Sequence, residues 1–444
     1  MNIDRVRVKG LFDDFDHDLA FGTDERIMLV IGPNGFGKTT TLKLIDMLFN
    51  QPINRLASMP FRKVDVSFDD GARLIAKRAT ANRHRGGDQL PLTLTCHRGG
   101  VTETFDLPGG LVDQNGPGFP MSAVEEFIPI LDRVGFRKWH NIETGSILDL
   151  DDVLIHFGDE LPHGFRSGAL PSPDWLEDLR HSIAVRLINT ERLTRVSRQR
   201  GHGRTVNTER TVSYCSQQLA HHIKDSSAKY GALSQLRDRT FPARLVDADR
   251  RQSNGSVETL RKDFDAIDQK LSQLEDVGLL AEEQLDLEIP DLDLVDESQR
   301  SVLAVYAADA KEKLAVFDEL YGKVSTFKRI VNSRFCHKQV AVSKKGLRVA
   351  KDDGTNLDLE QLSSGEQHEL VMLYELLFRA SSNSLILIDE PEISLHVAWQ
   401  ERWLEDLEEA AKLSGFRAIV ATHSPEIIGD RWHLAVELHG RNEG

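Results

Sequence analysis

The sequence predicts an α/β fold that carries an inserted helical arm, and three observations lead to this prediction. A short apolar run at 27–31, IMLVI, leads into a glycine-rich stretch and then a helical pattern. Two later apolar runs, LILID at 385–389 and RAIVAT at 417–422, are followed by polar residues, as buried parallel strands often are. The intervening residues 205–335 are polar and helix-prone. We therefore expect a mixed sheet flanked by helices, with the arm inserted between its two halves.

The first lobe is expected to combine the strand at 27–31 with a helix and an antiparallel patch. Segments 63–78 and 91–106 show short alternations such as KVDVSF and TETFDL, which predict antiparallel strands. Apolar residues recur at helical spacing after the glycine-rich stretch, at Leu42, Ile45 and Leu48.

The arm is predicted to consist of amphipathic helices. One pattern covers 257–280 and a second covers 304–331, and the acidic residues 281–299 between them, which include Pro290, are expected to form a linker or an exposed turn. A helix of about 40 residues would reach roughly 60 Å, as in a short coiled coil. The apolar positions that repeat every three or four residues are Leu260, Phe264, Ile267, Leu271 and Leu274 in the first pattern, and Leu314, Phe317, Leu320 and Val324 in the second.

Composition and charge limit the class of protein. The 444 residues suffice for a large core, and no apolar run reaches membrane-spanning length. The N-terminal MNIDRVRVKG lacks the apolar core of an export signal, so a cytoplasmic location is expected. The net charge of −15, from 55 basic and 70 acidic residues, argues against a generally basic nucleic-acid binder. The shifts in composition predict three parts: an N-terminal lobe (1–195), the arm with a basic segment (196–335) and a C-terminal lobe (336–444).

The stretch GPNGFGKT at 32–39 matches the P-loop pattern, in the required position between a strand and a helix. Its glycines allow backbone N–H groups to surround a β-phosphate, while Lys38 offers a cation to the β/γ oxygens and Thr39 offers a hydroxyl to Mg²⁺. The residues predicted to bind the nucleotide here are Gly32, Asn34, Gly35, Gly37, Lys38, Thr39 and Thr40.

A P-loop needs acidic partners, and the strand-like run at 385–389 ends in them. Asp389 can hold Mg²⁺ together with Thr39, and Glu390 can polarise the attacking water. Alone, two acids after a strand would indicate only a solvated turn, but the P-loop favours the catalytic interpretation. His423 follows the strand at 417–422, where its imidazole could contact the γ-phosphate.

The turn LSSGEQ at 362–367 precedes a helix and contains no catalytic side chain. Two capping boxes fit its spacing, Ser363 with Glu366 or Ser364 with Gln367. In either case Gly365 lies in the first helical turn, where exposed N–H groups can bind an anion.

This ordered set of motifs resembles the ABC ATPase superfamily over residues 1–195 and 336–444. The resemblance implies ATP and Mg²⁺ as ligands, and a dimer or higher even oligomer in which the signature turn of one protomer covers ATP on another. It implies that Ser363 and Gly365 make these contacts between protomers. It also implies that Lys38, Glu390 and His423 act in catalysis.

The stretches LSSGEQ, IDEPEISLHVAWQ and ATHSPEII look like the AAA_21/AAA_15 clade, which includes the overcoming-lysogenisation-defect nucleases and is related to RecF and SMC proteins. They are also similar to stand-alone ATPases of bacterial anti-phage defence modules of the Septu type. Only 21 residues follow His423, too few for the Toprim nuclease of this clade, so a separate effector, a nuclease encoded nearby, is the expected partner. The glutamine loop is not assigned, because Asn189 and Glu191 stand where its glutamine is expected.

A basic segment at 192–210 is compatible with a DNA or RNA contact or with a flexible solvated loop, and Arg192 could instead contact the nucleotide. These interpretations are weighted about equally. The predicted function is an ATPase that controls an effector. A RecF-like DNA-repair ATPase is the alternative, and the energy subunit of a transporter fits less well because a strand-like segment separates the arm from the signature turn. The arginines of the segment are Arg192, Arg195, Arg198, Arg200, Arg204 and Arg210.

Overall fold

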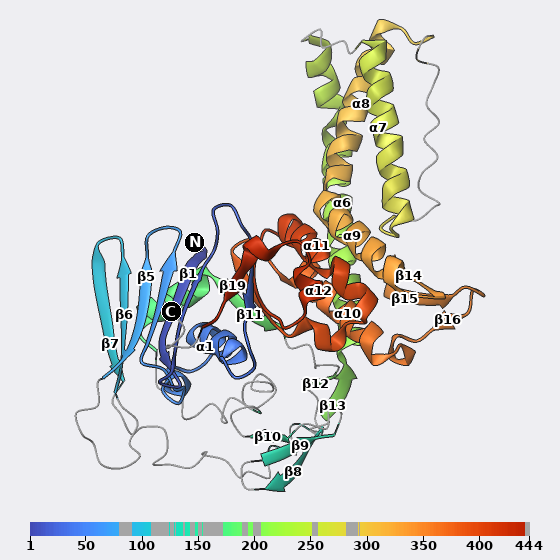
Figure 1. Cartoon of the computed structure of the whole chain (residues 1–444). Coiled ribbons are helices and arrows are strands. Elements are labelled where there is room, and N and C mark those ends of the chain that lie inside the picture. Colours follow the sequence, from blue (N-terminus) through green and yellow to red (C-terminus); the bar gives the residue numbers. More distant parts are fainter. Residues whose placement is uncertain are drawn as a thin grey trace. The chain divides into compact units, whose positions relative to one another are not determined.

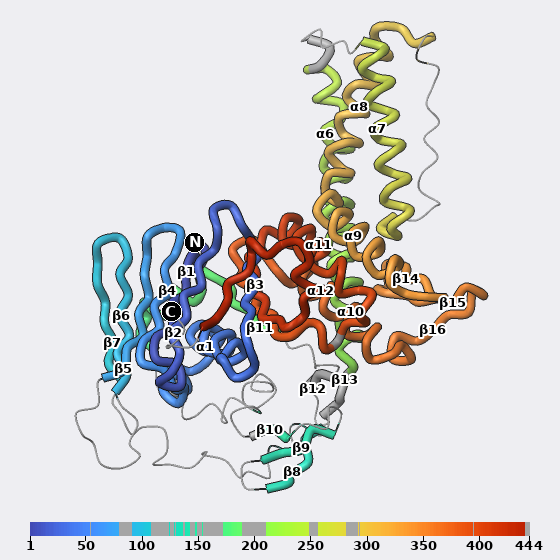
Figure 2. Tube along the Cα trace, in the orientation of Figure 1, coloured from blue at the N-terminus to red at the C-terminus, as the bar shows by residue number. Residues whose placement is uncertain are grey.

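The computed structural model divides the chain into two compact units (Figures 1 and 2). The first consists of Met1–Thr211 together with Glu375–Gly444, and the second of Val212–Tyr374. No helix among the described residues is long and apolar enough to cross a membrane. The structure describes the whole chain except residues 80–90, 108–123, 125–127, 129, 136–137, 143–146, 150–152, 154–171, 189–193, 199–205, 251–255, 281–291, 293 and 440–444.

The first unit contains a five-stranded parallel sheet in the order β11-β17-β18-β3-β19. The apolar runs at 27–31, 385–389 and 417–422 all lie in it, which confirms them as strands. Because the strands are parallel, their carboxyl ends meet at one edge, where ligands of such sheets bind. The strands are β3 (Ile27–Ile31), β11 (Ala184–Ile188), β17 (Ser384–Asp389), β18 (Arg417–Ala421) and β19 (Ala435–Glu437).

The second large sheet of this unit is antiparallel and has six strands in the order β2-β1-β4-β5-β6-β7. It confirms the predicted antiparallel patch. Its inward-facing residues join those of α1 and the parallel sheet in one hydrophobic core. Its strands are β1 (Ile3–Leu11), β2 (Phe15–Ala20), β4 (Lys63–Phe68), β5 (Arg73–Arg78), β6 (Leu92–Arg98) and β7 (Val101–Leu107). Two small sheets consist of β8 (Leu131–Gly135), β9 (Lys138–Asn141) and β10 (Ile147–Asp149), and of β12 (Thr194–Arg198) and β13 (Val206–Arg210).

The helices of the first unit follow the predicted patterns where these were readable. The helix α1 (Lys38–Asn50) buries Leu42, Ile45 and Leu48, the three residues predicted to face the core. The other helical elements are α2 (Ile53–Leu56), α5 (Asp174–Ser182), α11 (Val397–Ser414) and α12 (Pro425–Ile428), the π-helical η4 (Glu375–Arg379), and the 3₁₀ turns η5 (Pro391–Ser394) and η6 (Trp432–Leu434).

The second unit is largely helical, as expected for the arm. Its long helices are α6 (Thr211–Arg250), α7 (Val257–Asp276), α8 (Glu297–Ala315) and α9 (Asp318–Arg334). All nine apolar positions predicted from the two patterns are buried. The second pattern is nevertheless two helices, with a break at Val316 and Phe317. The buried ring of Phe317 lies 5.5 Å from that of Tyr230 on α6.

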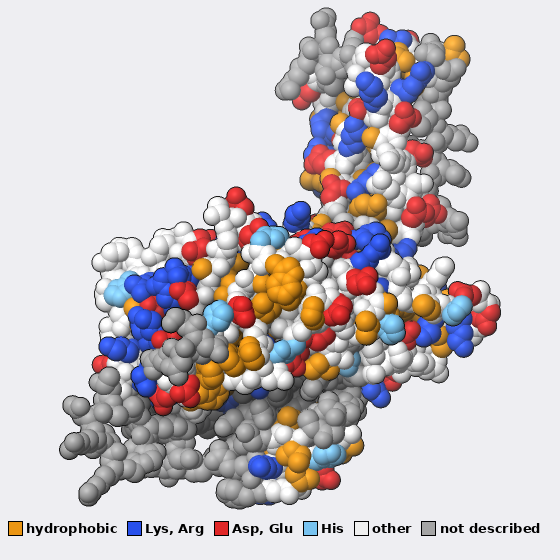
Figure 3. Space-filling view, in the orientation of Figure 1, with side chains coloured by type: hydrophobic (Ala, Val, Ile, Leu, Met, Phe, Trp, Pro, Cys, Tyr) orange, Lys and Arg blue, Asp and Glu red, His pale blue; other side chains and the backbone are white. Residues whose placement is uncertain are grey.

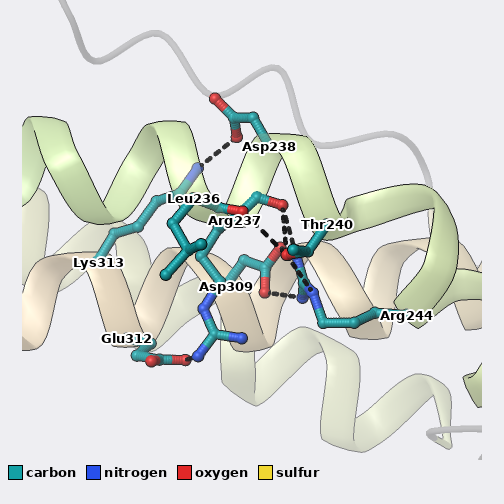
Figure 4. A network of polar contacts seen from close by, with 8 residues as sticks. All are labelled: Leu236, Arg237, Asp238, Thr240, Arg244, Asp309, Glu312 and Lys313. Carbon is teal, nitrogen blue, oxygen red and sulfur yellow. Dashed lines mark hydrogen bonds and ion pairs between the residues drawn. The ribbon is translucent and has the colours of Figure 1, made fainter.

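Charged pairs connect α6 with α8 (Figure 4). Arg244 donates to both oxygens of Asp309, with Nη2 2.6 Å from Oδ2, and Arg237 pairs with Glu312. Lys313 reaches Asp238 at 2.9 Å. Acidic and basic side chains are interspersed along the visible face of the arm, as on a solvated helical surface (Figure 3).

The base of the second unit is an antiparallel sheet that packs against the start of α6. Gly346 has φ of 99°, and a Cβ there would lie 2.4 Å from the carbonyl oxygen of Ser216. The next residue, Leu347, donates its backbone N–H to Ser216 Oγ at 2.8 Å. The elements are β14 (Lys338–Ser343), β15 (Gly346–Lys351), β16 (Asn356–Leu357), the 3₁₀ turn η3 (Leu359–Gln361) and α10 (Ser364–Tyr374).

Candidate nucleotide-binding site

The P-loop connects β3 to α1. Gly35 and Gly37 have φ of 86° and 79°, in the left-handed region that glycine adopts without a steric penalty. No side chain caps α1, so the N–H groups of its first turn stay available for an anion. Gly32, Asn34, Gly35 and Gly37 lie in this loop, and Lys38, Thr39 and Thr40 form the first turn of the helix.

Lys38 lies against its own loop. Its ammonium donates to the carbonyl oxygens of Gly32 at 2.7 Å and Pro33 at 3.1 Å. Burial lowers the pKa of Lys38, while the charges of Glu390, Asp389 and Glu392 act in the opposite direction. A bound phosphate would satisfy this cation better than two neutral carbonyl groups do, because hydrogen bonds between charged groups are stronger.

Asp389 ends β17 directly beside the P-loop helix. Thr39 Oγ1 donates to Asp389 Oδ1 at 3.1 Å, so the two predicted magnesium ligands are adjacent. Burial raises the pKa of Asp389, the charges of Glu390 and Glu392 raise it further, and the Thr39 hydrogen bond and the charge of Lys43 oppose this shift. Such a carboxylate gains from a nearby cation.

Glu390 has a backbone conformation that its sequence did not reveal. Its φ and ψ are 45° and 56°, a left-handed conformation unusual for a residue other than glycine. Its N–H donates to the carbonyl of Ala421 on β18 at 2.9 Å, which holds this turn against the sheet. Strain of this kind persists where the surrounding structure enforces it, often at functional sites.

His423 lies 3.9 Å from Glu390, measured from Nε2 to Oε1. Its position depends on Glu392, which sequence analysis did not single out. The Glu392 carboxylate accepts from the His423 N–H at 2.6 Å and from Thr422 Oγ1 at 2.9 Å. The only sequence signal for Glu392 was its place two residues after Glu390, and this spacing does not predict a contact 31 residues away.

Among the described residues, no group of three or more His, Cys, Asp or Glu side chains is arranged to hold a metal ion. Thr39 and Asp389 instead fit Mg²⁺, which commonly takes one or two protein ligands together with substrate phosphates and water. The hydroxyl, the half-buried carboxylate and the adjacent phosphate-binding loop are the groups that this mode requires.

The signature turn belongs to the second unit and forms the first of the two predicted capping boxes. Ser363 N–H donates to Glu366 Oε2 at 2.9 Å, and Glu366 N–H approaches Ser363 Oγ at 3.4 Å. Lys338 on β14 contacts the same carboxylate at 2.7 Å. Together these contacts lower the pKa of Glu366, although its burial acts against them. Gly365 lies in the first turn of α10, as predicted.

Two other predictions fall largely outside the described residues. Asn189 and Glu191, considered for the glutamine loop, lie there, as do Arg192, Arg200 and Arg204 of the basic segment. Ten residues of that segment form the antiparallel pair β12–β13, so its backbone is not simply a loop.

Comparison with known proteins adds one family match. A family model described as "AAA domain, putative AbiEii toxin, Type IV TA system" matches residues 216–429, just under half of the chain. The match contains the signature turn, Asp389, Glu390 and His423, but it begins after the P-loop and does not include it. No curated protein matches the chain.

Several solved structures are similar to this chain. The SMC head domain from Thermotoga maritima is 12% identical, with a TM-score of 0.33, and the alignment covers 98% of this chain and 92% of that one. An Smc head domain with an extended coiled coil, bound to the C-terminal domain of ScpA and derived from Pyrococcus furiosus, is 12% identical, with a TM-score of 0.32 and coverages of 96% and 91%. An SmcHead bound to the C-winged helix domain of ScpA is 11% identical, with a TM-score of 0.34 and coverages of 96% and 91%.

The parallel sheet, the P-loop between β3 and α1, and the acidic end of β17 define a P-loop NTPase fold of the ABC type. The chain carries an ATPase-type domain of this class. The AAA-domain match covers most of the second unit and residues 375–429 of the first.

Proposed function

We propose that this chain binds ATP with Mg²⁺ and hydrolyses it. The hydrogen bond from Thr39 to Asp389 is the observation that carries this proposal, since it brings the P-loop helix and the acidic strand end together. A glycine-rich turn alone would bind any anion. A turn beside a buried carboxylate and a hydroxyl is suited to a phosphate that carries a divalent cation.

The chain's own groups have distinct roles in this proposal. The N–H groups of the P-loop and the Lys38 ammonium hold the β- and γ-phosphates, and Thr39 and Asp389 hold the metal. Mg²⁺ supplies positive charge that neutralises the phosphate oxygens. Glu390 orients and deprotonates the attacking water, and His423, held by Glu392, donates a hydrogen bond to the γ-phosphate.

Direct binding of ATP tests the proposal. Lys38→Ala should weaken ATP affinity about 10- to 100-fold, because it removes charge-assisted hydrogen bonds to phosphate. Lys412→Ala, on the exposed surface of α11, is the matched control and should bind as the wild type does. Isothermal titration calorimetry would measure both, and equal affinity of Lys38→Ala and the wild type would contradict the proposal.

We further infer that ATP is enclosed between two copies of the chain. The signature turn supports this, since it lies at the N-terminus of α10, and a helix N-terminus can bind an anion. Two-fold pairing would give two equivalent sites. Light scattering should show an ATP-strengthened dimer for Glu390→Gln, which retains ATP, and Gly365→Asp should weaken it by adding negative charge. A monomer at all ATP and protein concentrations would rule this arrangement out.

The finer proposal is that the chain controls a separate effector, a nuclease, in bacterial anti-phage defence. The arm supports it, because four long helices exceed what ATP chemistry needs and present a mixed charged surface for a partner. If ATP changes partner affinity, the partner must change ATP affinity by the same factor. Co-purification with the product of the adjacent gene, lost on deletion of 250–300, tests this. Metal-dependent DNA cleavage by the chain alone would refute it, and loading onto gapped DNA without a partner would favour the RecF-like alternative.

A further inference from the structure

The P-loop rests on the hairpin formed by β1 and β2. A Cβ at Gly37 would lie 2.6 Å from Leu11 Cδ2 and 3.6 Å from His17 Cε1. Leu11 ends β1, and His17 lies in β2, three residues after the turn. Both side chains are buried, with His17 3% exposed. These two side chains are therefore packed directly beneath the last turn of the P-loop.

The hydrogen bonds around Thr41 favour a proton on Nδ1 of His17. Thr41 Oγ1 donates to the carbonyl oxygen of Gly37 at 2.8 Å, and this uses its single proton. His17 Nδ1 lies 3.0 Å from the same hydroxyl oxygen. With the hydroxyl proton given to Gly37, the hydroxyl oxygen can only accept, so this arrangement places a proton on Nδ1. In this arrangement His17 donates to Thr41, and Thr41 donates to the P-loop carbonyl of Gly37.

The neutral ring is the form that this position favours. Burial lowers the pKa of His17, while the charge of Asp16 and the carbonyl of Phe36 act weakly against it. Lys38, on the helix packed above, turns its ammonium toward the carbonyls of Gly32 and Pro33. His17 Nε2 is buried and makes no hydrogen bond to the described residues.

We propose that His17 is a positioning residue of the nucleotide site: as a neutral ring protonated on Nδ1, it holds Thr41 and, through it, the Gly37 turn in the conformation that binds phosphate. This inference rests on the proposed ATP binding and adds to it a residue from the antiparallel sheet, 15 residues before the P-loop begins. Without the His17 donor, the Thr41 hydroxyl can rotate away from the Gly37 carbonyl, and the turn loses a fixed support.

Three substitutions at His17 separate positioning from simple packing. His17→Asn places an amide N–H near the position of Nδ1 and should keep ATP affinity within about three-fold of the wild type. His17→Gln places its amide near Nε2 instead, and His17→Leu offers no donor. Both should bind ATP about ten-fold more weakly, the usual effect of losing one buried hydrogen bond. Retained affinity in His17→Leu, or equal loss in all three variants, would overturn the proposal.

A second histidine provides a matched control. His97 on β6 of the same sheet places Nδ1 2.9 Å from Thr102 Oγ1, in an exposed pair of the same kind. His97→Leu should leave ATP affinity unchanged, and a loss equal to that of His17→Leu would contradict a specific role. Thr41→Val should reproduce the His17→Leu defect, and combining the two should add little, since both break one chain of hydrogen bonds.

The tautomer can be read without any nucleotide. In ¹⁵N-histidine spectra of the full chain, the signal lost in His17→Asn should show a protonated Nδ1 and an unprotonated Nε2 at neutral pH. A proton on Nε2 alone would refute the inference even if ATP binds. Conversely, failure of the wild-type chain to bind ATP would refute the proposed function while leaving the His17 tautomer measurable.

Discussion

Acidic residues have different partners on the arm and at the nucleotide site. On the arm, Asp309 is 6% exposed and receives two hydrogen bonds from Arg244, so its charge is neutralised within the fold (Figure 4). At the nucleotide site, Asp389 accepts a hydrogen bond from the neutral hydroxyl of Thr39. The charge of Lys43 also acts on this carboxylate, while the nearby Lys38 ammonium donates to two carbonyl groups of its own loop.

This difference in partners is what we expect between a structural ion pair on the arm and a carboxylate that is available to a ligand. A half-buried carboxylate whose hydrogen bond comes from a neutral hydroxyl costs free energy, so a fold retains it where some other function requires it. The left-handed backbone of Glu390 supports this interpretation, because it is a second unfavourable feature beside the Asp389 carboxylate at the end of β17. The arm has paired charges, and its polar contacts fix the alignment of α6 with α8.

The largest expected effect concerns ATP hydrolysis at Glu390, directly after β17. Glu390→Gln should lower the ATP hydrolysis rate about 10²- to 10⁴-fold while ATP still binds, because it removes the general base. Steady-state turnover and equilibrium binding would be measured on the same preparation. Glu405→Gln, at an exposed position on α11 near Arg431, is the control and should keep full turnover. Unchanged hydrolysis by Glu390→Gln would remove the catalytic assignment.

On the arm, the corresponding substitution should cost stability and leave ATP affinity unchanged. Asp309→Asn removes the partner of Arg244, a partly exposed guanidinium, and should lower the free energy of unfolding by about 1–3 kcal/mol. Denaturant titration followed by circular dichroism would measure this loss. An Asp309→Asn protein as stable as the wild type would show that the pair contributes only alignment.

At the nucleotide site, the matched substitution should increase the stability of the nucleotide-free protein. Asp389→Asn keeps an acceptor for Thr39 and removes a charge whose pKa burial raises, so the nucleotide-free protein should melt at a higher temperature. This gain should be largest above the raised pKa and vanish as the pH falls through it, since Asp389 is then protonated. Magnesium-dependent ATP binding should be lost. A lower melting temperature at neutral pH would show that the carboxylate stabilises the empty site.

The smallest effect should appear as a pH dependence from His17. Because burial lowers its pKa, the neutral ring contributes stability that is fully present above the ordinary value of 6.5 and declines as the pH falls toward the lowered pKa. The slope from this one group is at most about 1.4 kcal/mol per pH unit. Thermal melts of wild type and His17→Asn between pH 7 and 5 would compare them, and parallel curves would exclude this contribution.

Local patterns predicted much of this molecule, and long-range contacts decided the remainder. The buried faces of α7 and α9 followed from apolar spacing, but the break between α8 and α9 did not. It lies where Phe317 packs against Tyr230 of α6, a residue far away in the sequence. The capping box was ambiguous in the sequence for a similar reason. Lys338, 28 residues away from Glu366, holds the carboxylate that caps Ser363, whereas Gln367 is buried and donates to the carbonyl of Leu362.

The sequence by itself determined the P-loop, the acidic end of β17 and the place of His423 after β18, because each is a short motif attached to an apolar strand. Parallel pairing of these strands then brings the motifs to one edge. Only the tertiary structure decided that Glu392 holds the His423 turn, that Glu390 is left-handed and that His17 lies beneath Gly37. The physical reason is that these contacts join residues distant in the chain, and no periodicity or spacing within one segment encodes them.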